Sequence, residues 1–594
     1  MNHDTLTQAA EVGISTVIDQ AITLAKTGDS SGVLSAAFTE SIKKVRITDE
    51  NHYVLAIKPV LKSLKTNPPI SIGDIEKLTK PPKSSKSRYS QKEEDNHTEQ
   101  GRQSKTDLLI DFVSQWAQVF CDESGKAYAT FPVQSLIPET GELLPPHHET
   151  WPLDSKQFRG KVSREFRKAY GIVPGESAIK EATEVLAADA EDRPAEPVYL
   201  RVAPNPSNEG GVLIDLANEA YQIIEITGGG WRVLNASECP VKFRRVQHSR
   251  PLPLPARDGD VNLLWDHLNV QGEDERLLVL AWLLECLRTE TPYPVLELIA
   301  GQGSAKSTTQ ERLRQLIDPN AVLLRMEPRS NQDLSVSALG NHMICLNNLS
   351  GLSKSTQDFM CSVSTGGGDA TRRLHTTEDE AAWDTKRPIV MNGINQLVTR
   401  PDLADRTLCL ELHKIRAYID EATLKAAWVQ DYPKILGGLY DLLAHTLRDL
   451  PLVKLDKLPR MGDFAKLGTA MCLALNNPHS FVAMFNANRD RVVARGVESS
   501  PVALALVSFI RAEKLFEGTA SHLMREISRE PYIPTHYDRQ AWPKSPRGLG
   551  EILRRLAPSL QVYGIDVQQA AGRSRTTLYT IQLIDTVSDT PMAS

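Results

Sequence analysis

Apolar residues change their spacing several times along this chain, and each change marks a predicted element. They recur at helical spacing between residues 14 and 61 but almost vanish in the later part of 66–105, where prolines, serines and charges dominate. The first pattern predicts a helical N-terminal segment over 1–65. The second predicts a disordered linker over 66–105, whose charges serve solvation rather than binding.

Helices near 107–119 and 155–171 come next, followed by several short strands with Asn/Gly-rich turns between them. This order favours a mixed α+β domain over 106–255 that contains an antiparallel meander. Asp215 and Glu225 lie on neighbouring strands of that meander. Two carboxylates on a sheet could hold metal in a primase or nuclease. A solvated face is the stronger interpretation, because no third acidic partner or catalytic histidine accompanies them.

The middle of the chain contains an apolar helix near 273–288 and then five short β-rich runs, several of them separated by helical or polar segments. Parallel strands that are buried on both faces have this continuous apolar character. We therefore expect an α/β core with a parallel sheet over 260–415. The five runs are 295–299, 321–324, 343–346, 389–391 and 408–412.

The last third of the chain is helical in pattern and then changes to a mixed plan. Helices dominate 416–497, whereas three helices followed by two strands occupy 500–585. The second arrangement is the plan of a winged helix. The predicted elements are helices over 422–429, 432–447, 464–476, 502–514 and 519–528, a helix starting at Ser545 and Pro546, and strands over 565–569 and 577–583.

Composition and charge narrow the class of protein. Hydrophobic residues make up 41% of the chain and charged residues 24%, as in ordinary globular proteins. No run reaches 18 apolar residues, and the first residues lack a basic segment followed by an apolar one, so we expect a soluble cytoplasmic protein with no membrane partner. The seven cysteines include no C-x-x-C pair, which argues against zinc and disulfides.

One motif suggests the chemistry of the core. The strand predicted over 295–299 runs into a glycine-containing loop that ends in Lys-Ser-Thr and opens a helix, which is the layout of a phosphate-binding loop. In such loops backbone N–H groups surround an anion, the lysine reaches the outer phosphates, and the serine hydroxyl binds Mg²⁺. The expected nucleotide-binding residues are Gly301, Gln302, Gly303, Ser304, Ala305, Lys306, Ser307 and Thr308.

The loop departs from the pattern G-x-x-x-x-G-K-S at both glycine positions, which are Ala300 and Ala305 here. Alanine tolerates positive φ poorly. The loop must therefore take a compatible turn at these two positions or carry some strain.

Polar residues follow the carboxyl ends of the predicted strands. Asn347 and Asn348 come after one strand, Asn392 after the next, and Arg400 and Arg406 beyond it. A polar residue beside the phosphate-binding loop positions the attacking water, and an arginine beyond the next turn reaches the γ-phosphate of a neighbouring subunit. A plain turn residue at the strand end is the alternative for Asn392.

Two further stretches carry positive charge. Glycines followed by Arg372, Arg373 and His375 predict a β-hairpin over 366–376 that suits a DNA backbone, with a solvated hairpin as the alternative. Between 539 and 577 seven cations and two acidic residues give +5, on a chain whose net charge is −6. This reversal is expected for duplex contact by a winged helix, although some winged helices bind only protein. The seven cations are Arg539, Lys544, Arg547, Arg554, Arg555, Arg573 and Arg575.

The loop, the Thr365–Arg373 hairpin, Arg387-Pro-Ile-Val-Met-Asn392 and Thr399–Arg406 together resemble the AAA+ helicases of superfamily three and their phage, prophage and mobile-element relatives, especially primase-helicases. The resemblance covers residues 260–450 and implies an AAA+ P-loop ATPase that uses ATP and Mg²⁺, with a helical lid over 416–497. It implies a homo-oligomeric ring, a hexamer, acting on DNA in the replication of a phage or mobile element.

The same resemblance assigns roles to individual residues. The hairpin grips single-stranded DNA in the central pore with Arg372 and Arg373. Asn392 acts as sensor, and Arg406, with Arg400 as second choice, acts across a subunit interface. The winged helix then loads the ring onto duplex DNA at an origin or replication fork.

One departure opens an alternative function. The strand that should end in an acidic Mg²⁺-binding residue ends in Asn347 and Asn348. An amide binds Mg²⁺ only weakly and cannot act as a base. A nucleotide-binding, DNA-associated regulator or defence component with weak or no hydrolysis is therefore the second hypothesis. A primase built on 106–255 is a third and weaker one, because no acidic triad or zinc motif supports it.

Overall fold

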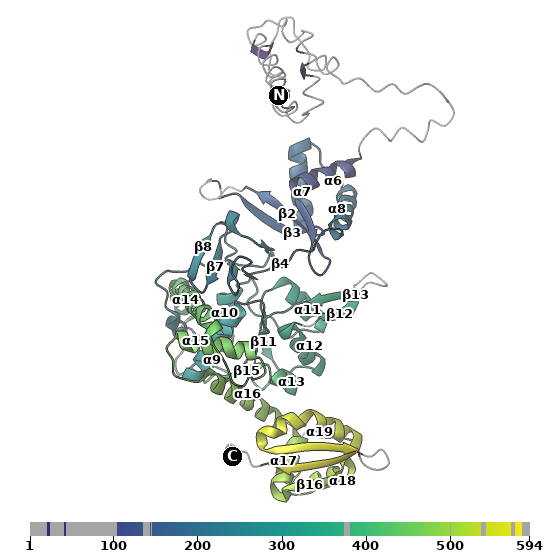
Figure 1. The fold of residues 1–594 in the computed structure, drawn as a ribbon, viewed down its shortest axis with the longest axis vertical. Helices are drawn as coiled ribbons and strands as arrows, with labels where there is room; N and C mark the ends of the chain where they lie inside the picture. The colour runs from purple at the N-terminus through teal and green to yellow at the C-terminus, as the bar shows by residue number, and fades with distance from the viewer. Residues whose placement is uncertain are drawn as a thin grey trace, which may run out of the picture. The chain divides into compact units, whose positions relative to one another are not determined.

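The computed structural model divides the chain into two compact units, Met1–Arg102 and Gln103–Ser594. It describes residues 104–134, 143, 145–366, 368–372, 380–498, 500–535, 542–571 and 577–584, and in the first unit only 21–23, 38, 41 and 42, which are helical. Apart from these positions and the end of the predicted linker, the segments predicted over 1–65 and 66–105 lie outside the described residues. Figure 1 shows the elements of the second unit.

The second unit begins with a small α+β domain that sequence analysis predicted only in part. Its three strands form an antiparallel sheet in the order β1-β2-β3, and its helices pack on this sheet around Leu109, Phe131 and Phe158. The helix predicted over 107–119 ends earlier, because Ala117 is extended and the next residues pair with β2. The elements are α6 (Lys105–Trp116), β1 (Gln118–Cys121), β2 (Ala127–Val133), β3 (His147–Pro152), α7 (Lys156–Tyr170) and α8 (Glu176–Glu191).

The predicted antiparallel meander is present as a four-stranded sheet in the order β5-β6-β7-β8. The segments predicted as its first and last strands instead supply a two-residue parallel pair, β4 with β9. The elements are β4 (Val198–Tyr199), β5 (Val202–Pro204), β6 (Val212–Asp215), β7 (Ile223–Thr227), β8 (Gly230–Leu234) and β9 (Lys242–Phe243).

The centre of the unit is a parallel sheet of four strands in the order β11-β14-β10-β15. The prediction of a fifth strand is wrong, because the run 321–324 does not form one. In its place Arg325 makes an isolated parallel bridge to Leu346, so only one residue of this segment pairs with the sheet edge. The strands are β10 (Val295–Ile299), β11 (Ile344–Leu349), β14 (Ile389–Gly393) and β15 (Thr407–Glu411).

Helices cover both faces of this sheet, as the sequence predicts. Successive residues of β10 point to opposite faces, so Leu296 and Leu298 join one hydrophobic core and Val295 and Ile299 join another. The first core contains residues of α9 (Glu273–Cys286), α10 (Lys306–Ile317), α14 (Glu421–Asp449) and α15 (Gly462–Ala474). The second contains residues of α11 (Asn331–Gly340), α12 (Lys354–Thr365), α13 (Pro401–Ala404) and α16 (Phe481–Glu498).

Sequence analysis expected a boundary near 255–260, but one hydrophobic core continues across it. Residues of the meander, including Ile214 and Trp231, share the first core with α9 and α14. Arg201, which is 1% exposed, fixes this packing by donating hydrogen bonds to Ser249 Oγ and to the backbone oxygen of Asp215. The meander is therefore packed as part of the central domain.

A single helix replaces the two predicted over 422–429 and 432–447. Helix α14 continues through Pro433, whose carbonyl accepts a hydrogen bond from Ala256 N at 2.8 Å. The connector passes so close that a Cβ on Gly438 would lie 2.3 Å from Val261 N. Burial of this helix against the core outweighs the local cost of the proline.

The C-terminal elements follow the predicted plan with one addition, the strand β16. Three helices pack on an antiparallel sheet in the order β16-β18-β17, with Leu506, Leu549 and Ile581 in their common core. The elements are α17 (Pro501–Glu513), β16 (Leu515–Thr519), α18 (Ala520–Ile527), α19 (Pro546–Leu560), β17 (Ile565–Ala571) and β18 (Thr577–Leu583).

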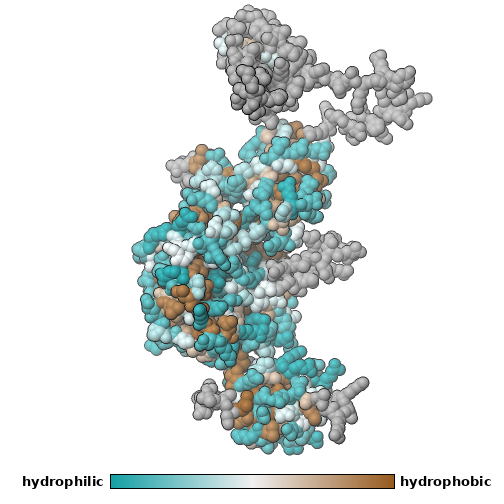
Figure 2. Space-filling model, in the orientation of Figure 1, coloured by the Kyte–Doolittle hydropathy of each residue, from teal (hydrophilic) through white to brown (hydrophobic). Residues whose placement is uncertain are grey.

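Hydrophilic residues cover most of the described surface on the face drawn in Figure 2, with hydrophobic residues gathered in small patches. Among the helices that the structure describes, none is by itself long and apolar enough to span a membrane. Two consecutive helices, Phe481–Glu498 and Pro501–Glu513, are long and apolar enough only when taken together, and the chain bends by 98° between them.

Candidate functional site

The loop between β10 and α10 has the backbone of an anion-binding turn. Gly303 has φ +72° and Ala305 has φ +55°, so the alanine at the second glycine position takes the left-handed conformation that alanine disfavours. Helix α10 starts at Lys306 with no side chain capping it. Its first N–H groups and its positive end are therefore available to an anion.

Lys306 lies against the loop that it follows. Its Nζ donates hydrogen bonds to the backbone oxygens of Ala300 at 2.6 Å and Gly301 at 3.1 Å. Desolvation lowers the pKa of this lysine below its ordinary value. The two carbonyls are neutral, so no carboxylate competes with a phosphate for this side chain in these hydrogen bonds.

Side chains from three neighbouring segments meet beside this loop. Asn347 Oδ1 accepts a hydrogen bond from Ser307 Oγ at 3.0 Å and another from Asn392 Nδ2 at 2.7 Å. Asn392, which is fully buried, also donates to Gln310, and its Oδ1 accepts from Asn348 N at 2.8 Å. Parallel order brings these residues together, because β14 lies between β10 and β11 and all three end at the same edge.

A bulge in β11 places the two asparagines of that strand. The pairing with β14 shifts register between Leu346 and Leu349, and Asn348 takes φ +57°. Bulges re-aim side chains next to functional sites. Here the irregular pair at the strand end brings Asn347 to Ser307 and the Asn348 backbone to Asn392.

The oxygens that meet beside the loop offer a divalent cation only a weak site. The oxygens that meet beside the loop come from a hydroxyl and from amides, and Mg²⁺ sites usually include at least one carboxylate. No group of three or more His, Cys, Asp or Glu residues is arranged to hold a metal ion in the described part of the chain. Ser307 and Asn347 are the residues that would hold Mg²⁺ here.

The back of the loop is tied to two other segments. Asn269 Nδ2 donates to Ser304 O at 3.0 Å and to His413 O at 2.6 Å. Ile415 N donates to Gly303 O at 3.0 Å. Gly303 has φ +72°, a conformation that side chains disfavour, and a Cβ there would also lie 2.7 Å from the Tyr418 hydroxyl.

The two predicted arginines lie beyond the cluster formed by Ser307, Asn347 and Asn392, and each is ion-paired in the single chain. Arg400 pairs with Asp358 of α12 at 2.7 Å. Arg406 pairs with Asp402 at 2.7 Å, and Asp402 also contacts Arg460 at 2.6 Å. Neither arginine contacts Lys306 or the cluster in the hydrogen bonds and ion pairs that the structure describes.

A hairpin is present but longer than the predicted 366–376, because β12 (Gly368–Arg372) pairs antiparallel with β13 (Glu380–Asp384), which lies beyond that range. Its backbone places Arg372 at the last paired position of β12, opposite Glu380. Arg373 and His375 lie outside the described residues.

Four of the predicted C-terminal cations are described, and all are exposed. Lys544 precedes α19, whereas Arg547, Arg554 and Arg555 lie on it. Arg547 lies 3.8 Å from Glu551, one helical turn further along. Arg539, Arg573 and Arg575 lie outside the described residues.

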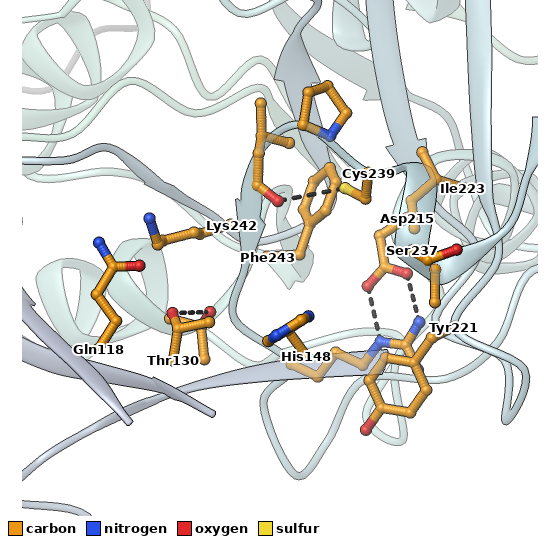
Figure 3. A pocket seen from close by; sticks show the side chains of 15 residues that line it. Gln118, Thr130, His148, Asp215, Tyr221, Ile223, Ser237, Cys239, Lys242 and Phe243 are labelled. Carbon is orange, nitrogen blue, oxygen red and sulfur yellow. Dashed lines mark hydrogen bonds and ion pairs between the residues drawn. The ribbon is translucent and has the colours of Figure 1, made fainter. Parts of the chain in front are cut away.

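Asp215 and Glu225 are partners of arginines. Asp215 receives two hydrogen bonds from Arg245, at 2.9 and 2.6 Å, and Glu225 pairs with Arg232. Asp215 and Tyr221 line a pocket of about 280 Å³ between the small α+β domain and the meander, and Figure 3 shows their side chains among those that line it. Asp215 is 1% exposed, so the predicted solvated face is wrong for this residue, and both carboxylates are paired with arginines rather than arranged for a metal.

Sequence reasoning missed three buried residues that organise this site. Gln310 lies one helical turn after Lys306 and binds the backbone oxygens of Leu346 and Val390 at 3.0 Å each. Glu297 and Gln357 bind the segment that follows β14. Only Glu297 gave a signal, as a single charge inside the apolar run of β10.

The fold and the loop together define the class: an α/β protein with a parallel sheet and a strand, loop and helix of the phosphate-binding type. Residues 261–491 match the family model of the actinomycete integrative conjugative element replication protein, AICE RepA, and residues 502–591 match the AICE RepA C-terminal domain. The two adjacent matches span more than half of the chain. Over these residues the chain is similar to the replication proteins of actinomycete integrative conjugative elements.

Solved structures give weaker likenesses. "SCCmec type IV Cch - active helicase" has a TM-score of 0.39 and 13% identity, over 79% of this chain and 93% of that one. The apo NrS-1 C-terminal region has a TM-score of 0.34 and 12% identity, over 81% and 100%. JCV helicase has a TM-score of 0.20 and 14% identity, over 40% and 64%. These TM-scores are too low to carry an argument. Comparison with curated proteins gave no match.

Proposed function

We propose that this protein is an ATP-dependent DNA helicase or translocase of the AAA+ type, acting in the replication of an integrative element. The observation that carries the proposal is the meeting of Lys306, Ser307, Asn347 and Asn392 at the carboxyl ends of adjacent parallel strands. In open α/β sheets, ligands bind at this edge.

The residues of the loop then have defined tasks. The backbone N–H groups of 301–308 bind the phosphates, and Lys306 exchanges the carbonyls of Ala300 and Gly301 for outer phosphate oxygens. Bound Mg²⁺ would neutralise charge between the phosphates. Ser307 and Asn347 would hold it, and Asn392 would orient water near the outer phosphate while keeping Asn347 in place.

An oligomeric ring would complete the site. Arg406 and Arg400 are separated from the loop in one chain and bound to Asp402 and Asp358. In a ring, an arginine of one subunit neutralises the charge at the nucleotide of the next. We propose a homo-oligomeric, hexameric ring in which Arg406 has this role and Arg400 is the second choice.

Two parts of the chain would contact DNA. The β12–β13 hairpin, with Arg372, Arg373 and His375, would hold single-stranded DNA in the pore. The C-terminal domain would act as a winged helix, with α19 in the major groove and the β17–β18 turn on phosphate. Its support is the order of helices and strands and the exposure of Lys544, Arg547, Arg554 and Arg555.

A second function is favoured by one observation. Amides and hydroxyls alone form the cluster beside the loop, so it includes no carboxylate that could act as a base. A chain that binds ATP and DNA but turns over ATP slowly would act as a nucleotide-dependent regulator.

Binding measurements test the nucleotide site directly. We expect a fluorescent ATP analogue to bind the full chain, and Lys306→Ala to weaken binding at least about tenfold through loss of a charge-assisted contact. Lys354→Ala is the matched control, because Lys354 is also the first residue of its helix and is exposed. Equal affinity in wild type and Lys306→Ala would contradict the proposed site.

A further inference from the structure

Four consecutive backbone amides between the nucleotide-site residues Asn392 and Arg406 are bound by two buried side chains from different elements. Leu397 N and Val398 N donate to Glu297 Oε1, at 2.6 and 3.3 Å. Thr399 N and Arg400 N donate to Gln357 Oε1, at 2.9 Å each. The segment 397–400 is thus held from β10 on one side and from α12 on the other.

Glu297 attaches this segment to the strand that leads into the phosphate-binding loop. The residue is fully buried, burial raises the pKa of its carboxyl, and its Oε2 has no hydrogen-bond partner in the described part of the chain. Burying a carboxyl group with a hydrogen bond to only one of its two oxygens costs folding free energy. The hydrogen bonds from Leu397 N and Val398 N partly offset this cost, so breaking them would leave the carboxyl with no backbone hydrogen-bond donor among the described residues.

Gln357 attaches the same segment to α12, and all of its hydrogen-bonding capacity is used near that contact. The residue is fully buried, and its Nε2 donates to Leu352 O at 3.1 Å and to Thr399 Oγ1 at 3.0 Å. The guanidinium of Arg400 also donates hydrogen bonds to both carboxylate oxygens of Asp358, the residue after Gln357. Residues 399 and 400 therefore move with α12.

Helix α12 is also the base of the hairpin. It ends at Thr365, three residues before β12 starts at Gly368. The chain returns from β13 to the same helix, because Arg387 N donates to Val363 O at 2.8 Å. Both ends of the hairpin are thus fixed to the C-terminal turn of α12, and a tilt of this helix moves the hairpin.

We propose that Gln357 is the positioning residue that couples the nucleotide site to the β12–β13 hairpin, by making segment 397–400 and α12 move as one body. The proposal rests on the proposed function, since it assumes that nucleotide binds beside Asn392 and that the hairpin contacts DNA. A nucleotide that shifts Asn392 would shift 397–400, and Gln357 would pass the shift to α12.

The test compares the affinity for a fluorescent oligothymidine with and without a non-hydrolysable ATP analogue. Gln357→Leu keeps the volume but removes every bond that side chain 357 makes to residues 399 and 400, while the Asp358–Arg400 pair stays. Gln357→Glu keeps an oxygen that accepts both backbone amides, as Glu297 does for residues 397 and 398. Ser364→Ala is the matched control, because Ser364 is fully buried on the same helix and, among the described residues, its hydroxyl bonds only Cys361 O of that helix.

We expect the analogue to change oligothymidine affinity about five- to 150-fold in wild type, the usual range of coupling between sites. The ratio of oligothymidine affinities with and without the analogue should fall to about one in Gln357→Leu. It should stay near the wild-type value in Gln357→Glu and Ser364→Ala. All three variants should still bind the ATP analogue. Backbone amides of residues 399 and 400 should exchange faster with deuterium only in Gln357→Leu.

Other outcomes would overturn the inference. A wild-type ratio in folded Gln357→Leu would remove Gln357 from the coupling. Equal loss in Gln357→Glu would show that packing, not acceptance of the two amides, is what matters. If Gln357→Leu does not fold, Gln357→Glu and Ser364→Ala can still be compared. An affinity ratio of about one in Gln357→Glu, with a wild-type ratio in Ser364→Ala, would then contradict the proposal. Failure of wild type to bind the ATP analogue would instead refute the proposed function.

Discussion

Replacing Asn347 by aspartate tests how the amide cluster limits the chemistry of the loop. Asn347 Oδ1 already accepts hydrogen bonds from Ser307 at 3.0 Å and Asn392 at 2.7 Å, so an aspartate fits with its two bonds retained. Each bond becomes charge-assisted, and hydrogen bonds to charged groups contribute roughly 1 kcal/mol more than neutral ones. The free energy of unfolding of the variant should not fall.

The larger effect concerns Mg²⁺. A carboxylate is the preferred protein ligand of this cation, whereas an amide oxygen carries no charge. A gain of about 1.4–2.8 kcal/mol in binding Mg²⁺ with nucleotide corresponds to roughly 10- to 100-fold tighter binding. We therefore expect Asn347→Asp to lower the Mg²⁺ concentration needed for half-maximal ATP turnover by about that factor.

The assay is steady-state ATP hydrolysis across a Mg²⁺ titration, at saturating ATP, for wild type and Asn347→Asp. Asn331→Asp serves as control, because Asn331 is the first residue of α11 and its side chain bonds only Ser355 O within the described part of the chain. An unchanged Mg²⁺ midpoint in Asn347→Asp would refute the placement of Asn347 at the metal. A shift of the same size in the control would show a general charge effect.

Three further predictions concern packing, pH and DNA. Gly438→Ala should lower the free energy of unfolding by about 1–3 kcal/mol or more through overlap with the crossing connector, whereas Gly160→Ala, which meets open space on α7, should not. Equal stability of the two variants in urea unfolding would contradict this packing. Burial lowers the pKa of His342 from 6.5 to about 4. Between pH 6.5 and 4 the unfolded chain therefore binds more protons at this residue than the folded chain does. The free energy of unfolding should fall by up to ~3 kcal/mol as the pH drops through this window. His342→Gln should flatten that dependence in acid titrations, and an equally steep loss would exclude His342 as its source. Changing Arg554 and Arg555 together to glutamate should weaken duplex binding at all sequences and reduce the salt slope by about two, and an unchanged slope would place the DNA contact elsewhere.

The parts of the site that the sequence could predict are those that follow from strand order. Lys306, Asn347 and Asn392 each follow an apolar run, and parallel strands bring their carboxyl ends to one edge. The C-terminal helices were also predictable, because Ser545 and Pro546 mark the start of α19 by local capping chemistry.

The parts that the sequence could not predict depend on tertiary contacts. The run 321–324 has the composition of a strand, but only Arg325 pairs with β11. Pro433 suggests a helix break, yet α14 continues because its apolar face is buried against the core. Gln357 has no local signature, since its role depends on amides more than 40 residues away in the chain.

The most direct test of the account is steady-state ATP hydrolysis by the full chain with and without single-stranded DNA, with Lys306→Ala as the blank. The account predicts turnover that single-stranded DNA stimulates and that Lys306→Ala abolishes. ATP binding without turnover under any DNA condition would contradict the helicase function and favour the nucleotide-dependent regulator.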